Sequence, residues 1–188
     1  MSRFVASLAL LLSLAAAPVA HARRCGGVSM DDNVTVGDAT LVLNGMGIRE
    51  ATVFNVDVYV AGLYLPEPTN SPRTILDGDT PKRLVMHFVR DVDRSDMDEA
   101  IREGFGDVAE RHAAAITRFA NMFPEEIRSG TILTFDYVPG RGLSVRVGNR
   151  NKGTIRGAGF ARAFFRIFVG PNPPNRGLKR GLLGGTCG

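Results

Sequence analysis

The order of hydrophobic patterns along the chain limits the folds that it can adopt. Strand-like segments rich in branched and aromatic residues come first, two helix-like segments follow, further strands come next, and helices close the chain. Strands and helices do not alternate regularly, so the pattern argues against a parallel sheet built from strand–helix–strand units. The predicted class is α+β: a large, mostly antiparallel sheet with a layer of helices on one face.

The predicted strands are bounded by glycine and proline. Residues 132–147 form the clearest hairpin, with Pro139-Gly140-Arg141-Gly142 at its turn. Gly45-Met46-Gly47 predicts a turn or bulge, and a long strand-like run follows over residues 52–65. The other predicted strands are residues 34–36, 40–44, 83–89 and 153–155.

Four segments have the spacing of helices with one apolar side. Ser95-Asp96-Met97-Asp98 resembles a capping box and predicts a helix that begins near Ser95. Residues 115–123 form a second apolar stripe, which Pro124 ends. Residues 160–168 and the short segment 178–183 complete the helical layer.

Residues 1–22 have the features of a secretory signal peptide. Arg3 precedes a nearly unbroken apolar run over residues 4–17, and Ala20-His21-Ala22 is a small-x-small cleavage site. The sequence therefore predicts a mature chain of residues 23–188, folded as one domain in the periplasm or outside the cell. An uncleaved membrane anchor is the alternative, and no later segment has the length of apolar sequence that a span needs.

Cys25 and Cys187 are the two cysteines of the chain and would lie at the two ends of the mature protein. The ends of a domain often lie close together, and an oxidising compartment favours disulfides. The two residues are therefore a candidate disulfide, with two independent surface thiols as the alternative.

Charge is distributed unevenly along the sequence. All 19 acidic residues lie at or before Asp136, whereas residues 137–188 carry ten of the 23 basic residues and no acid. Arginines of this basic part, such as Arg146, Arg162 and Arg166, stand singly between apolar residues, which is typical of a solvated face. We therefore expect no nucleic-acid partner, and we expect the acidic and basic parts to lie side by side in one domain.

Motifs of nucleotide-binding loops, zinc proteases and serine hydrolases are absent from the sequence. Two histidines, His87 and His112, remain after residue 22. His87 stands in an apolar strand, where a core histidine is a more common role than a metal or haem ligand. The sequence thus predicts no cofactor.

Several segments that occur in order resemble the bacterial chalcone isomerase-like proteins of the chalcone isomerase fold family. They are NGMGIR (44–49) with VYVAGLYL (58–65), RLVMHFVRDV (83–92), REGF (102–105), GTIRG (153–157), FARAFF (160–165) and LKRGLLG (178–184). The resemblance covers roughly residues 36–184. It implies an open-faced β-sandwich, in which a ligand cleft lies between a large antiparallel sheet and a layer of helices.

The resemblance also implies two ligand-binding residues. Arg49 matches an arginine that is typical of the fold. In the plant enzymes that arginine stabilises negative charge on ligand oxygens, and in fatty-acid binders it pairs with the carboxylate. Tyr59 stands where the enzymes have a threonine, and a tyrosine there resembles the fatty-acid binders. Strand alternation places Tyr59 on the same side as Asn55 and Asp57, which predicts a polar face.

The other polar residues of the enzymes are not retained. Their tyrosine falls near Asp96 or Met97, their asparagine near Glu103 or Gly104, and their late threonine on Ala158. The resemblance therefore implies a non-catalytic protein that binds a small hydrophobic or amphipathic ligand, such as a fatty acid. Apolar helix residues would help to enclose its tail, although most serve the core: Phe105, Val108, Ile116 and Phe119.

Two other functions stay open. One is an isomerase or intramolecular lyase that acts on a chalcone-like or other enone substrate, with Arg49 as the catalytic residue. The other is a haem-binding protein with His87 or His112 as the ligand. The oligomeric state also stays open.

Overall fold

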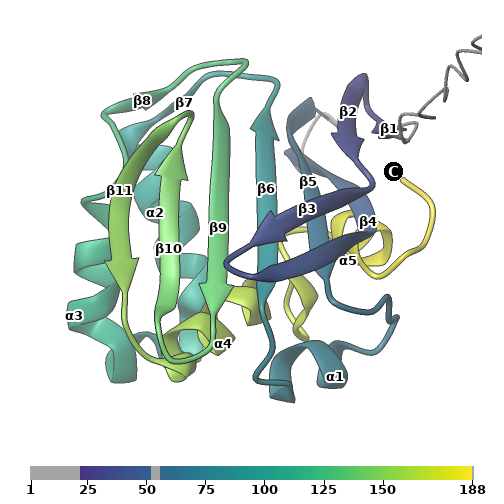
Figure 1. The fold of residues 1–188 in the computed structure, drawn as a ribbon. Helices are drawn as coiled ribbons and strands as arrows, with labels where there is room; N and C mark the ends of the chain where they lie inside the picture. Colours follow the sequence, from purple (N-terminus) through teal and green to yellow (C-terminus); the bar gives the residue numbers. More distant parts are fainter. Residues whose placement is uncertain (1–21, 52–55, 188) are drawn as a thin grey trace, which may run out of the picture.

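A computed structural model describes residues 22–51 and 56–187 (Figure 1). Its main feature is a curled, seven-stranded antiparallel sheet in the order β11-β10-β9-β6-β5-β4-β3. The strands are β3 (Asn33–Val36), β4 (Ala39–Ala51), β5 (Val56–Leu65), β6 (Lys82–Phe88), β9 (Ile132–Val138), β10 (Gly142–Val147) and β11 (Arg150–Ile155). The predicted signal peptide, apart from Ala22, lies outside the described residues.

Helices cover one face of this sheet. Figure 1 looks onto the sheet with the helical layer behind it. The layer consists of α2 (Arg94–Phe105), α3 (Ala109–Ala120), α4 (Ala158–Val169) and α5 (Arg176–Leu182), with a 3-10 turn (Gly106–Val108) between α2 and α3. The predicted α+β class with an antiparallel sheet and a helical layer is confirmed.

Three shorter parts complete the fold. Helix α1 (Pro72–Asp77) connects β5 to β6, and a hairpin of β1 (Ala22–Cys25) and β2 (Val28–Asp31) lies beside β4. Strands β7 (Val92–Asp93) and β8 (Glu126–Ile127) form a small separate ladder. None of the helices in residues 22–51 and 56–187 has the length and hydropathy needed to cross a bilayer.

Strand β5 separates two hydrophobic cores. Its odd-numbered residues Tyr59, Ala61, Leu63 and Leu65 belong to the large core under the helices. Val60 and Tyr64 of the same strand belong to a smaller core with residues of β1 to β4. Both faces of β5 are therefore buried from Tyr59 onward, as its continuous apolar sequence requires.

Phenylalanine rings fill the centre of the large core. Phe135 of β9 and Phe164 of α4 lie 4.7 Å apart between ring centroids, and Phe119 of α3 contacts both of them. Phe105 and Phe119, which we expected mainly to serve the core, lie fully within it, whereas Val108 and Ile116 pack partly buried at its margin. The middle of the sheet–helix interface is thus occupied by side chains.

Several boundaries differ from the prediction. Helix α2 begins at Arg94 because Asp93 caps it: the Asp93 carboxylate accepts the Asp96 N–H at 2.9 Å. Ser95 instead donates its hydroxyl to Asp93. Of the two alternatives predicted for Gly45-Met46-Gly47, the turn is wrong and the bulge agrees with the structure: the segment lies within β4, next to a register shift between Leu43 and Gly45.

The two ends of the described chain are joined covalently. Cys25, at the end of β1, forms a disulfide with Cys187, and their Cα atoms lie 5.7 Å apart. In Figure 1 the C-terminus accordingly ends beside β1.

Candidate ligand-binding site

Two glycines of β4 allow helix α5 to lie directly on the sheet. A Cβ atom at Gly45 would lie 2.1 Å from the carbonyl oxygen of Gly181, and one at Gly47 would lie 2.5 Å from that of Leu178. Gly181 is restricted in the same way, because a Cβ atom there would lie 2.2 Å from the Met46 oxygen. Helix α5 and strand β4 therefore pack backbone to backbone, which larger residues would prevent.

Arg49 follows these glycines on the same face of β4, since side chains alternate along a strand. Gly47 meets Leu178, so Arg49 lies beyond it, toward the N-terminal end of α5. Near this end, the Asn175 side-chain amide donates to the Ile48 oxygen at 3.1 Å. Arg49 is half-buried, and its Nη1 donates to the backbone oxygen of Glu50.

Tyr59 lies opposite Arg49 on the neighbouring strand. The two residues are register partners of β4 and β5, and such partners project to the same face of a sheet. Tyr59 is buried in the core under the helices, and its ring centroid lies 5.3 Å from that of Phe88. The expected polar face of β5 is wrong for Tyr59, which is buried, whereas Asp57 is exposed; a register shift between Arg49 and Glu50 separates their pairing positions, and Asn55 lies outside the described residues.

Both the Arg49 guanidinium and the Tyr59 hydroxyl can donate hydrogen bonds to a ligand. Burial raises the pKa of the Tyr59 phenol well above its usual range, and the positive charge of Arg49 opposes that rise. Tyr59 is therefore an uncharged hydroxyl at neutral pH, and its register partner Arg49 bears a guanidinium group. An oxygen-bearing anion such as a carboxylate is the chemical group that this combination binds best.

The positions that match the enzymes' other polar residues do not place a further polar side chain beside Arg49 and Tyr59. Met97 packs against the core, and Gly104 fits against α4, where a Cβ atom would lie 2.9 Å from Cγ2 of Ile167. Ala158 lines a cavity together with Lys82, at the start of β6, whereas Tyr59 pairs with Phe88 at its end. The structure therefore does not bring Ala158 to Arg49.

The two histidines lie on different layers. His87 is half-buried on the face of β6 that points away from the helices, so it is not a fully buried core residue. His112 is on α3, with its ring centroid 6.0 Å from that of Phe160. The described part of the chain has no cluster of three or more His, Cys, Asp or Glu side chains that could hold a metal ion.

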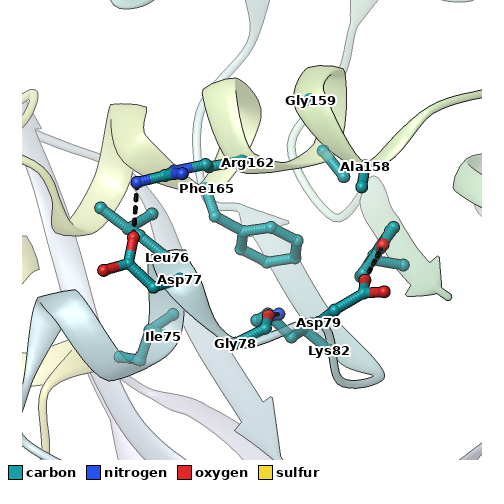
Figure 2. A pocket seen from close by; sticks show the side chains of 12 residues that line it. Ile75, Leu76, Asp77, Gly78, Asp79, Lys82, Ala158, Gly159, Arg162 and Phe165 are labelled. Atoms are coloured by element: carbon teal, nitrogen blue, oxygen red, sulfur yellow. Dashed lines mark hydrogen bonds and ion pairs between the residues drawn. The ribbon is translucent and has the colours of Figure 1, made fainter.

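Two cavities are present elsewhere in the described residues, and neither is lined by Arg49 or Tyr59. One, of about 210 Å³, lies between α1, α4 and the start of β6 (Figure 2). The other, of about 330 Å³, is an open groove along α5 lined by Pro171, Pro173, Arg176, Lys179, Arg180 and Leu183. Sequence patterns gave no indication of the first cavity, because its walls come from segments far apart in the chain.

Comparison with known proteins agrees with this architecture. A family model described as chalcone isomerase-like matches residues 22–184. The fold also resembles the crystal structure of a fatty-acid binding protein from Arabidopsis thaliana, with a TM-score of 0.69 and 17% sequence identity over 84% of this chain and 92% of that one. No curated protein matches the chain by sequence.

Proposed function

The chain belongs to the chalcone isomerase-like family, and from that premise we propose that it binds an amphipathic acid, such as a fatty acid, rather than closing chalcones. The observation that carries this proposal is the register pairing of Arg49 with Tyr59. The pair presents a cation and a neutral hydroxyl on the face of the sheet that the helices cover.

The chemistry of burial supports a cationic partner for the ligand. A carboxylate that leaves water without a counter-charge pays a large desolvation penalty, which an arginine reduces by a charge-assisted, two-pronged hydrogen bond. Tyr59 would add a third donor. The fold likeness to a fatty-acid binding protein is consistent with this role.

An isomerase function has less support. The enzymes' tyrosine falls near Asp96 or Met97, their asparagine near Glu103 or Gly104, and their late threonine on Ala158, so none of these three residue types is retained. Arg49 alone would have to supply the stabilisation of a developing oxyanion.

We further propose that the protein works in an oxidising compartment, in the periplasm or outside the cell, after removal of residues 1–22. The Cys25–Cys187 disulfide supports this location, because such bonds are rare in reducing compartments.

Ligand extraction tests the main proposal. Protein isolated from the periplasm of an expression host should carry acyl acids. Native mass spectrometry should detect them as a bound adduct, and extraction should release them. A protein that carries no acyl acid, and that shows no saturable binding of added palmitate, would overturn the proposal. Chalcone turnover above the uncatalysed rate would favour the isomerase instead.

A further inference from the structure

The cavity beneath α4 differs in composition from the Arg49–Tyr59 pair. Apolar side chains form much of its wall: Ile75, Leu76, Ala158, Ala161 and Phe165. Figure 2 shows the Phe165 ring between α4 and the segment that contains Asp79 and Lys82, the first residue of β6. The cavity lies at the Lys82 end of β6, and Tyr59 contacts the strand at its Phe88 end, so the two sites are separate.

Lys82 is the unusual residue of this cavity. It is only 4% exposed, although lysine is almost never fully buried without a charged partner. Its Nζ donates to the backbone oxygens of Gly78, at 2.6 Å, and Thr80, at 3.0 Å. It also lies 5.2 Å from the ring centroid of Tyr137. All of these partners are neutral groups.

The acidic side chains of the cavity are engaged elsewhere. Asp79 accepts a hydrogen bond from the Tyr137 hydroxyl. Asp77 pairs with Arg162 at the rim, as the dashed line in Figure 2 shows. None of the ion pairs among the described residues includes Lys82. A buried ammonium that has only neutral partners is costly, which favours the uncharged amine.

Burial has a direct effect on the protonation of this lysine. It lowers the pKa of Lys82 from 10.5 to about 8, although the charge of Asp79 acts in the opposite direction. A large share of Lys82 is therefore uncharged in mildly alkaline solution, whereas an ordinary lysine is almost fully protonated there. The uncharged form carries the lone pair that a nucleophile needs.

We propose that Lys82 is a nucleophilic site, which captures a small apolar aldehyde in this cavity as an imine. The amine nitrogen would attack the carbonyl carbon, and a proton would pass from nitrogen to the carbonyl oxygen. The resulting hydroxyl would leave with the second amine proton as one molecule of water, as the C=N bond forms. The reaction needs no oxidant or reductant, and hydrolysis reverses it.

The surroundings of Lys82 favour an aldehyde over an anion. A carboxylate or phosphate would meet the negative charge of Asp79, which is hydrogen-bonded to the neutral Tyr137 hydroxyl, whereas the charges of Asp77 and Arg162 offset each other in an ion pair. A short aldehyde is neutral, and its alkyl chain matches the apolar walls. The small residues Ala158 and Gly159 form part of the cavity wall on the α4 side.

Reductive trapping tests this proposal on the intact folded protein. The probe is butanal with sodium cyanoborohydride at neutral pH, followed by peptide mass spectrometry. The chain has three lysines, and Lys152 is exposed, so it serves as an internal control. We expect Lys82 to gain a butyl group at least about tenfold faster than Lys152, because far more of its amine is uncharged.

Two variants separate the cavity from general reactivity. Lys82→Arg should lose the fast labelling and leave Lys152 unchanged. Ala158→Leu, at an exposed position beside the cavity, should slow labelling of Lys82 several-fold, whereas Ala114→Leu, at an exposed position on α3, should not.

Three outcomes would overturn the proposal. The first is labelling of Lys152 and Lys179 ahead of Lys82. The second is labelling of Lys82 that Ala158→Leu does not slow, since the amine would then react outside the cavity. The third is a loss of butyl transfer to Lys82 when acetate or phosphate is added, which would identify an anion site instead.

Discussion

Arg49 and Lys82 show how the same sheet holds two cations in different ways. Arg49 is half-buried near the end of β4, where its planar group contacts the Glu50 backbone and, in the proposed function, would also bind the ligand carboxylate. Lys82 is buried at the start of β6, two strands away from β4 in this sheet, and its Nζ donates to backbone oxygens. The first position suits recognition of an anion, and the second disfavours the lysine's own charge.

Replacement of Arg49 should weaken ligand binding more than it affects folding. Arg49→Ala removes a charge-assisted interaction, so we expect palmitate affinity to fall roughly 10–100-fold, or about 1.5–3 kcal/mol. Arg49→Lys keeps the charge but not the fork and should lose less. Isothermal titration checks this, with Arg111→Ala, exposed on α3, as the matched control. Equal affinities of Arg49→Ala and the control would contradict the assignment.

Lys82 should make the protein more stable as the pH rises. Its pKa is about 8 in the folded protein against 10.5 for an ordinary lysine. Between these values the unfolded chain binds the extra proton, so the free energy of unfolding increases with pH, by on the order of 1–2 kcal/mol from about pH 7.5 to about pH 9.5.

Urea denaturation over this pH range checks the expected rise. The range stays below the ordinary tyrosine pKa of 10.0, above which the raised pKa values of Tyr64 and Tyr137, each about 12, would lower stability again. Lys82→Met should abolish the rise. An identical pH dependence in the variant and the native protein would show that another group is responsible.

At the scale of elements, the contact of α5 with β4 decides where the candidate site lies. Because Gly45 and Gly47 have no side chains, the helix occupies their face of the strand and leaves Arg49 as the next side chain. The glycines are thus needed for close packing within a strand, not for a turn.

A methyl group at Gly47 should therefore be poorly tolerated. The added Cβ would lie 2.5 Å from a backbone oxygen of α5, which cannot move aside as a flexible side chain can. We expect Gly47→Ala to lower the free energy of unfolding by about 2–3 kcal/mol. Gly159→Ala is the control, since its Cβ would have its nearest neighbour at 3.7 Å and should be neutral or slightly stabilising. Chemical denaturation of both variants checks this, and equal stabilities would contradict the packing account.

Sequence patterns predicted the elements that depend on local signals. The hairpin of β9 and β10 and the helix α4 are confirmed, because alternation and helical spacing decide them. Two elements with usable local signals were missed. Ser71-Pro72 is a cap followed by proline at the first turn of α1, and Gly26-Gly27 joins β1 to β2 as a two-residue turn.

The candidate sites depend less on local signals. The choice of Arg49 and Tyr59 rested on family resemblance, and their pairing requires the β4–β5 register, which a bulge shifts. The burial of Lys82 could not be predicted, because the residues around it come from α1, β9 and α4.

At the scale of the whole molecule, the acidic and basic parts of the sequence lie against one another. Arg162 pairs with Asp77, Arg166 with Asp107, and Arg146 with Asp136. The acidic and basic residues are thus separated along the sequence but lie close together in the folded protein. Most of these pairs are exposed, so each contributes little to the stability of the fold.

The disulfide should contribute much more to stability than these ion pairs. It joins residues separated by 162 positions, and a bond that closes so long a loop removes much entropy from the unfolded chain. We expect a Cys25→Ala, Cys187→Ser variant to lose roughly 3–5 kcal/mol. Urea unfolding of this variant beside the oxidised protein measures the loss, and coincident midpoints would contradict it.

The same bond makes the polypeptide between Cys25 and Cys187 a closed ring. A single endoprotease cut in an exposed loop, such as the one around Gly140, would open the ring without releasing a fragment. Exopeptidases would likewise find only the residues outside the ring to trim. Resistance to degradation would then depend on the redox state of its surroundings, so a nicked molecule would persist as one piece until a reductant reached it.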